Sequence, residues 1–174
     1  MIFFILILIF LIYFYFSYHT LLNQENTIQK IKSDLISITD KRFKIFEELI
    51  DQSLKFINYE ETFFSEIVQL RSQAQKHKQD KDDNLTFWCE EKISQLALKI
   101  NLLVSEYPTL NRIENIKDYQ EKILIMESNF SDLKKEYNLT IKKYNELKNS
   151  PIHYLTAHIF KRFYINIESW KITP

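Results

Sequence analysis

No glycine occurs anywhere in the 174-residue chain, and this absence limits the possible folds more than any other feature of the sequence. Glycine supplies the positive φ angles that tight hairpins need, so an all-β domain or an α/β domain with many short loops is disfavoured. Phosphate-binding loops, dinucleotide-binding turns and nucleophile elbows also need backbone without a side chain, and these motifs are absent. The sequence therefore predicts an all-α protein.

Charge and cysteine content exclude further classes of function. Lys plus Arg and Asp plus Glu each number 23, and no basic run is dense enough to attract nucleic acid. Cys89 is the single cysteine, which rules out an internal disulfide and a cysteine-based zinc site. We expect no nucleic-acid partner and no cofactor.

The chain opens with the apolar segment MIFFILILIFLIYFYF and stays uncharged until Glu25. A helix from Ile2 to Phe16 would span only about 22 Å, whereas continuation to Leu22 gives about 31 Å, the thickness of the hydrocarbon core. A cleaved signal peptide needs a basic start and a small-residue cleavage site, and neither is present. The segment from Ile2 to Leu22 is thus predicted to be a single transmembrane helix in contact with membrane lipid.

Basic residues predict the orientation of this helix. No Lys or Arg precedes the segment, and the first five that follow it are Lys30, Lys32, Lys41, Arg42 and Lys44. The positive-inside rule then predicts a cell-membrane protein with its N-terminus outside and its C-terminal body in the cytoplasm.

Apolar residues in the body recur every three or four positions, which is the spacing of helices packed side by side. They form four stripes, at Leu21 to Ile38, Phe46 to Leu70, Cys89 to Tyr107 and Ile116 to Leu147. Short connections between long helices imply antiparallel neighbours. We therefore expect the transmembrane helix to continue into an antiparallel up-and-down four-helix bundle.

Polar residues and prolines predict where these helices end. Thr39 and Asp40 are expected to cap a new helix between the first two stripes. The polar run 72–84 is expected to form the main loop, and Pro108 and Pro151 to end the third and fourth helices.

The predicted organisation is a transmembrane anchor at 1–22, a bundle at 23–150 and an amphipathic tail at 151–174. Apolar residues of the tail can share one helix face: Ile152, Leu155, Ile159, Phe163, Ile167 and Trp170. An up-and-down bundle returns its fourth helix toward the membrane, so the tail is expected near the bilayer. Its face could lie on the membrane surface or cover the open end of the bundle.

A distinctive pattern runs without a gap from Glu106 to Asn145 and includes Glu106, Tyr107, Pro108, Tyr137, Asn138, Tyr144 and Asn145. With the anchor and the four stripes, this pattern resembles the LemA family of membrane-anchored helical proteins. Upstream, Arg42, Glu60 and Arg71 fall at the family's spacing for its second helix. The chain departs from the family pattern at several positions, among them His19, Glu47, Leu70, Lys134 and Ser150.

The resemblance implies a four-helix cytoplasmic bundle on a single span, with the N-terminus outside. It implies no catalytic activity, because the family has no established one. Relatives take part in building membrane compartments such as magnetosomes.

Charged residues lie within or beside the apolar stripes: Arg42, Glu60, Arg71, Glu127 and Lys134. Carboxylates on different helices, here Glu60 and Glu127, suggest an alternative function as a metal-carboxylate carrier or enzyme. Such sites also use Glu-x-x-His pairs, and this sequence contains none. We favour ion pairs across the bundle that fix the register of the helices.

The sequence favours a non-enzymatic protein that presents its bundle to other membrane proteins or to a second copy of itself. Phe43, Phe64, Phe87 and Trp88 lie off the stripes, so some of them are expected to form an exposed docking patch. The second hypothesis is the metal carrier or enzyme at Glu60 and Glu127, and a third is membrane remodelling through the tail at 151–174.

Overall fold

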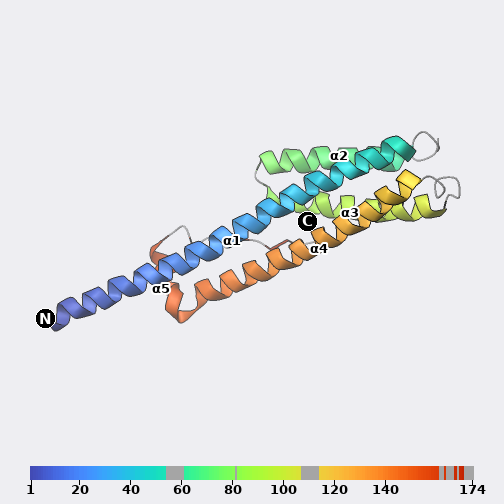
Figure 1. The fold of residues 1–174 in the computed structure, drawn as a ribbon. Coiled ribbons are helices and arrows are strands. Elements are labelled where there is room, and N and C mark those ends of the chain that lie inside the picture. The colour runs from blue at the N-terminus through green and yellow to red at the C-terminus, as the bar shows by residue number, and fades with distance from the viewer. Residues whose placement is uncertain are drawn as a thin grey trace. The chain divides into compact units, whose positions relative to one another are not determined.

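The computed structural model describes residues 1–53, 61–80, 82–106, 114–160, 163, 167, 169 and 170. Its helices are α1 (Ile2–Ser53), α2 (Glu61–Gln79), α3 (Asp83–Glu106), α4 (Glu114–Asn149) and α5 (Pro151–Ile159) (Figure 1). The all-α class expected from the absence of glycine is confirmed.

Helix α1 runs without interruption through Thr39 and Asp40, so the break predicted there is wrong. Thr39 is buried, and its hydroxyl donates a hydrogen bond of 2.9 Å to the carbonyl oxygen of Ile36. This bond satisfies the hydroxyl inside the helix, where it caps nothing. The predicted second stripe is therefore divided, with its first part on α1 and its last part on α2.

The connection between α2 and α3 is shorter than the loop predicted at 72–84, because α2 continues well into this polar run. Ala74 is buried and extends the apolar stripe, while its polar neighbours form the solvated face of the helix. Asp82 then caps α3, since its Oδ1 accepts a 3.1 Å hydrogen bond from the backbone N–H of Leu85.

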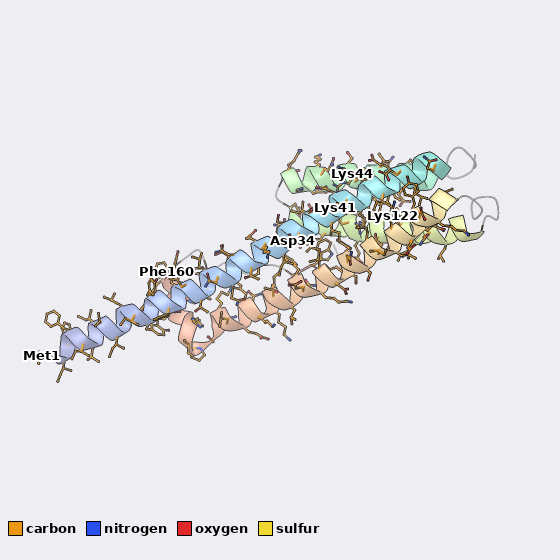
Figure 2. The ribbon with its side chains drawn as sticks, in the orientation of Figure 1. Met1, Asp34, Lys41, Lys44, Lys122 and Phe160 are labelled. Carbon is orange, nitrogen blue, oxygen red and sulfur yellow. The ribbon has the colours of Figure 1, made fainter. Side chains whose placement is uncertain are left out.

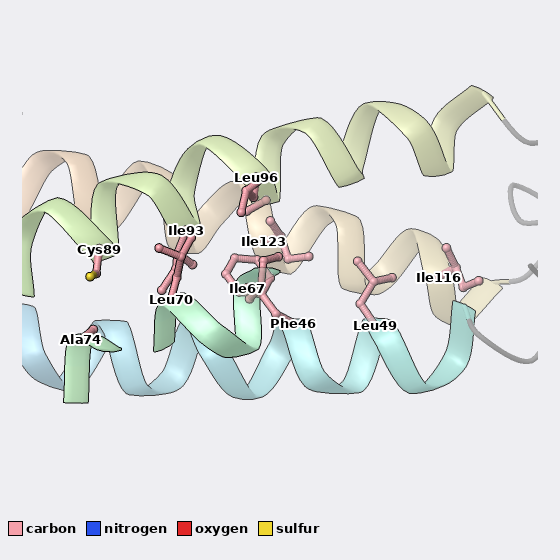
Figure 3. Packing of buried hydrophobic residues seen from close by; sticks show 11 residues of the cluster. Phe46, Leu49, Ile67, Leu70, Ala74, Cys89, Ile93, Leu96, Ile116 and Ile123 are labelled. Carbon is pink, nitrogen blue, oxygen red and sulfur yellow. The ribbon is translucent and has the colours of Figure 1, made fainter. Parts of the chain in front are cut away.

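The chain packs into two compact units, which we call unit 1 (Met1–Asp34 and Lys134–Ser169) and unit 2 (Leu35–Leu133 and Trp170–Pro174). Among the described residues, unit 2 contains the end of α1, all of α2 and α3, the start of α4, and Trp170 (Figure 1). Within unit 2, successive helices run antiparallel, as the predicted bundle requires (Figure 1). Figure 3 shows its apolar core: Phe46, Leu49, Ile67, Leu70, Ala74, Cys89, Ile93, Leu96, Ala97, Ile116 and Ile123.

Unit 1 pairs the first part of α1 with the end of α4 and with α5. Its buried apolar residues are Leu21, Ile28, Ile31, Tyr137, Ile141, Tyr144, Ala157 and Phe163. Pro151 lies in the first turn of α5 and holds Ser150 extended, at φ −67° and ψ 148°. The α conformation is disfavoured before proline, so α4 ends at Asn149 as predicted.

The start of α1 is long and apolar enough to cross a membrane and is the candidate span of this chain. Every side chain from Ile2 to Ile12 is at least 41% exposed, and the apolar side chains after Met1 are visible in Figure 2. A core helix of a soluble protein would bury such a segment. Here the segment stays exposed, as is expected of a helix that contacts membrane lipid.

The tail does not present its apolar residues on one face, so that part of the prediction is wrong. Ile152, Leu155 and Ile159 are exposed, whereas Phe163 and Trp170 are buried. The reason is that α5 ends at Ile159 and Phe160 has extended backbone angles, which breaks the helical period before the last apolar residues.

Candidate functional site

Arg42 on α1 lies at the centre of a buried ionic network in unit 2. Its side chain is 1% exposed, and Nη2 donates to Glu90 on α3, at 2.6 Å from Oε2 and 3.1 Å from the backbone oxygen. Nη1 donates to Ser94 Oγ at 2.5 Å and to Glu127 Oε1 and Oε2 on α4 at 3.1 and 3.3 Å. One guanidinium thus joins three helices.

Arg71 extends this network to α2. Its Nη1 lies 2.7 Å from Glu90 Oε1, so the two oxygens of Glu90 bind two different arginines. Its Nη2 pairs with Asp40 on α1, whose side chain is 49% exposed. The network therefore begins in the core and reaches the surface at Asp40.

The charges of the inner members of the network cancel, with two guanidinium groups facing the carboxylates of the buried Glu90 and the half-buried Glu127. Burying ions costs free energy that good geometry only partly returns, and loss of one partner leaves an uncompensated charge. All four helix segments of unit 2 contribute side chains to the network. A shift of one helix along another would break these ion pairs and leave charges without partners, so other registers are disfavoured.

Aromatic rings enclose the network. The Arg42 Cζ atom lies 4.2 Å from the centre of the Phe130 ring, and the Arg71 Cζ atom lies 5.3 Å from that of Phe43. Trp170 packs edge-on against Phe130 at 5.3 Å and stacks on Phe87 at 3.9 Å, with 13° between the two planes. A tail residue thereby covers the ring on which Arg42 rests.

The chemistry of this cluster suits holding the helices of unit 2 together. Both oxygens of Glu127 accept hydrogen bonds from Arg42, which leaves this carboxylate poorly suited to bind a cation. No group of three or more His, Cys, Asp or Glu side chains in the described part of the chain could hold a metal ion. Burial and the neighbouring Glu90 charge raise the pKa of Cys89, so its thiol is a weak nucleophile in the folded protein.

The charged residues that the sequence analysis proposed for ion pairs do not all lie together in the structure. The structure brings together Arg42, Arg71 and Glu127, whereas Lys134 is half-buried and belongs to unit 1. Glu60 lies outside the described residues. Sequence reasoning missed Asp40, Glu90 and Ser94, which complete the network.

A signal for the missed residues exists in the third helical segment. Glu90, Ser94 and Ala97 follow each other at intervals of four and three beside the apolar stripe, and all three are buried. Small and polar residues at helical spacing indicate a second inward face, which points Glu90 toward α1 and α2.

The residues of the family motif lie mainly in unit 1. Tyr137 and Tyr144 are buried, and Asn145 Nδ2 lies 3.5 Å from the Ile167 backbone oxygen. Asn138 is half-buried. Glu106 is the last residue of α3, and its side chain, like Tyr107 and Pro108, lies outside the described residues.

The aromatic docking patch predicted from the sequence is not formed as expected. Phe87 is buried against Trp170, while Phe43 and Trp88 pack against the core of unit 2. The Phe64 side chain lies outside the described residues. Aromatic residues off the stripes pack inward here because the helices of unit 2 have more than one buried face.

An exposed apolar groove of about 510 Å³ lies elsewhere on unit 2, between α3 and α4. Leu98, Leu102 and Leu124 line it and are 46%, 66% and 51% exposed. Gln120 Nε2 donates a 3.1 Å hydrogen bond to the Asn101 backbone oxygen and ties the two helices together beside the leucines. Exposed leucines grouped in a depression are typical of a docking surface.

Comparison with known proteins agrees with the resemblance seen in the sequence. The sequence model of the LemA family matches residues 28–168. No curated protein and no solved structure is significantly similar to the chain. Because the match covers most of its length, the chain belongs to the LemA family.

Proposed function

We propose that this LemA-family protein is a non-enzymatic membrane-anchored adaptor, which presents a helical bundle in the cytoplasm and binds a protein partner there. The observation that carries the proposal is the leucine-lined groove between α3 and α4. Burial of Leu98, Leu102 and Leu124 by an apolar helix would remove them from water, worth about 25 cal/mol for each Å² of apolar surface.

The ionic network supports the same proposal. A docking groove needs α3 and α4 held in one register, and Arg42 joins Glu90 and Ser94 on α3 to Glu127 on α4. A metal-carrier function draws no support from Glu127, whose oxygens are already bound. The partner is either another membrane protein or a second copy of this chain.

Photocrosslinking in native membranes tests the groove. With a photoreactive residue at Leu102, we expect a discrete adduct, whose mass identifies either a second copy or another protein. The same group at Lys44, an exposed position on α1 labelled in Figure 2, should give little adduct. A matched chain with Leu124→Glu should lose most of the Leu102 adduct. Equal yields at Leu102 and Lys44 would contradict the proposal.

The cytoplasmic orientation rests on Lys30 and Lys32, which closely follow the apolar segment. In a Cys89→Ala background, a cysteine at the exposed position Lys143 should resist a membrane-impermeant maleimide in intact cells. Labelling should appear only after the cells are permeabilised. Full labelling in intact cells would place the body outside.

A further inference from the structure

Helix α5 packs against the end of the candidate membrane span, within unit 1. Ser17 is 2% exposed, and its Oγ lies 2.7 Å from His153 Nδ1. The Tyr18 ring makes edge contacts with Phe160 and Phe163, at 4.9 and 5.3 Å between ring centres. These contacts place α5 level with the last part of the apolar segment.

The opposite face of α5 is apolar and exposed. Ile152, Leu155 and Ile159 follow a spacing of three and four and are 62%, 48% and 58% exposed. Phe160, labelled in Figure 2, is 39% exposed at the end of the same helix. The buried residues of α5 are Thr156 and Ala157.

The length of the span explains why such a face would be needed. The part of α1 from Ile2 to Phe16, which is exposed except at the half-buried Tyr13 and Phe14, reaches only about 22 Å. A hydrocarbon core is about 30 Å thick. Beyond Phe16 the α1 surface is partly covered, because Ser17 and Leu21 are buried. Next to this part of α1, the exposed apolar surface includes the outer face of α5.

The charges around α5 suit a lipid surface. No Asp or Glu lies between Glu146 and Glu168, and Lys161 and Arg162 follow the helix in sequence. Burial lowers the pKa of His153, so this side chain is neutral at pH 7 where it meets Ser17. Apolar and cationic residues without carboxylates are the composition of helices that lie at the interface of anionic membranes.

We infer that α5 is a second membrane contact, lying in the boundary between headgroups and acyl chains, with Ile152, Leu155 and Ile159 in contact with lipid. The exposed apolar part of α1 is shorter than the hydrocarbon core is thick. The outer face of α5 supplies further apolar surface at its end. The inference rests on the proposed membrane anchoring and is independent of the groove on unit 2.

Spin labels on the full-length chain test this inference. In a Cys89→Ala background, single cysteines at Leu155 and Ile159 are labelled with a nitroxide, and the protein is reconstituted into phosphatidylcholine–phosphatidylglycerol vesicles. Oxygen partitions into lipid and a nickel chelate into water, so relaxation by oxygen should dominate at both positions. Leu8 in the span is the lipid control, and Leu139, a leucine on α4 that is 53% exposed, is the water control.

The possible outcomes separate the two proposals. Oxygen dominance at Leu8, Leu155 and Ile159 but not at Leu139 supports the inference. Nickel access at Leu155 and Ile159 equal to that at Leu139, with Leu8 still in lipid, overturns it and leaves the anchor intact. Nickel access at Leu8 overturns the membrane anchoring and this inference together.

Discussion

Replacing Arg42 with methionine is expected to destabilise unit 2 by about 3–5 kcal/mol, the cost of breaking a buried ion pair by removing one partner. Methionine fills much of the same volume, so the loss comes mainly from charge and hydrogen bonding. Glu127 loses the hydrogen-bond donor that binds both of its oxygens, and of the two arginines that bind Glu90 in the described part of the chain Arg71 remains. Two carboxylates, with side chains 4% and 11% exposed, then face a single guanidinium within the described part of the network.

The rate at which a thiol reagent labels Cys89, the single cysteine, measures this loss of stability. Cys89 is 1% exposed and lies beside Glu90, so a thiol reagent reaches it only when unit 2 opens. A loss of 3–5 kcal/mol corresponds to labelling about 10² to 4 × 10³ times faster, since each 1.4 kcal/mol is a factor of ten. Lys44→Met, an exposed substitution on the same helix, should leave the rate nearly unchanged.

A double substitution separates charge from packing. Arg42→Met combined with Glu127→Met removes both the cation and the carboxylate that only Arg42 is shown to bind, and Glu90 still pairs with Arg71. We expect the double variant to be more stable than Arg42→Met alone, with a coupling of about 1–3 kcal/mol between the two sites. If the two effects simply add, the network is not the source of the destabilisation.

Much of the fold follows from local rules that the sequence displays openly. The absence of glycine indicates helices, and the stripe from Ile116 to Leu147 predicts α4 because its apolar residues recur at the helical period. Pro151 ends that helix through the restriction on the residue before it. These features depend on neighbours in the chain, so they can be predicted without any knowledge of tertiary contacts.

The errors arose where a side chain had two possible partners. Thr39 and Asp40 have the residue types of a helix cap, but in α1 Thr39 bonds to the preceding turn and Asp40 pairs with Arg71. Glu90 has the composition of a surface residue and is buried between two arginines instead. Long-range contacts decide whether such a side chain caps a helix, lies at the surface or forms a buried ion pair. The spacing of residues along one helix carries no information about those contacts.

The tail residue Trp170 gives the second large expected effect, because Trp170→Ala removes an indole that is 5% exposed. Loss of a buried aromatic side chain costs about 3–5 kcal/mol through lost burial and the cavity left behind. The cavity would open beside Phe87 and Phe130, and Phe130 would lose support for the face on which Arg42 rests. Cys89 labelling should therefore accelerate about as much as in Arg42→Met.

Two further variants make this result specific to the indole. Trp170→Phe should recover most of the stability, since a smaller ring can still stack on Phe87, while Ile159→Ala on the exposed face of α5 should leave Cys89 protected. Combining Trp170→Ala with Arg42→Met should cost less than the sum of the two, because both act on Phe130. If Trp170→Ala labels no faster than Ile159→Ala, the tail does not hold the ionic network in place, and the four helix segments fix their register without it.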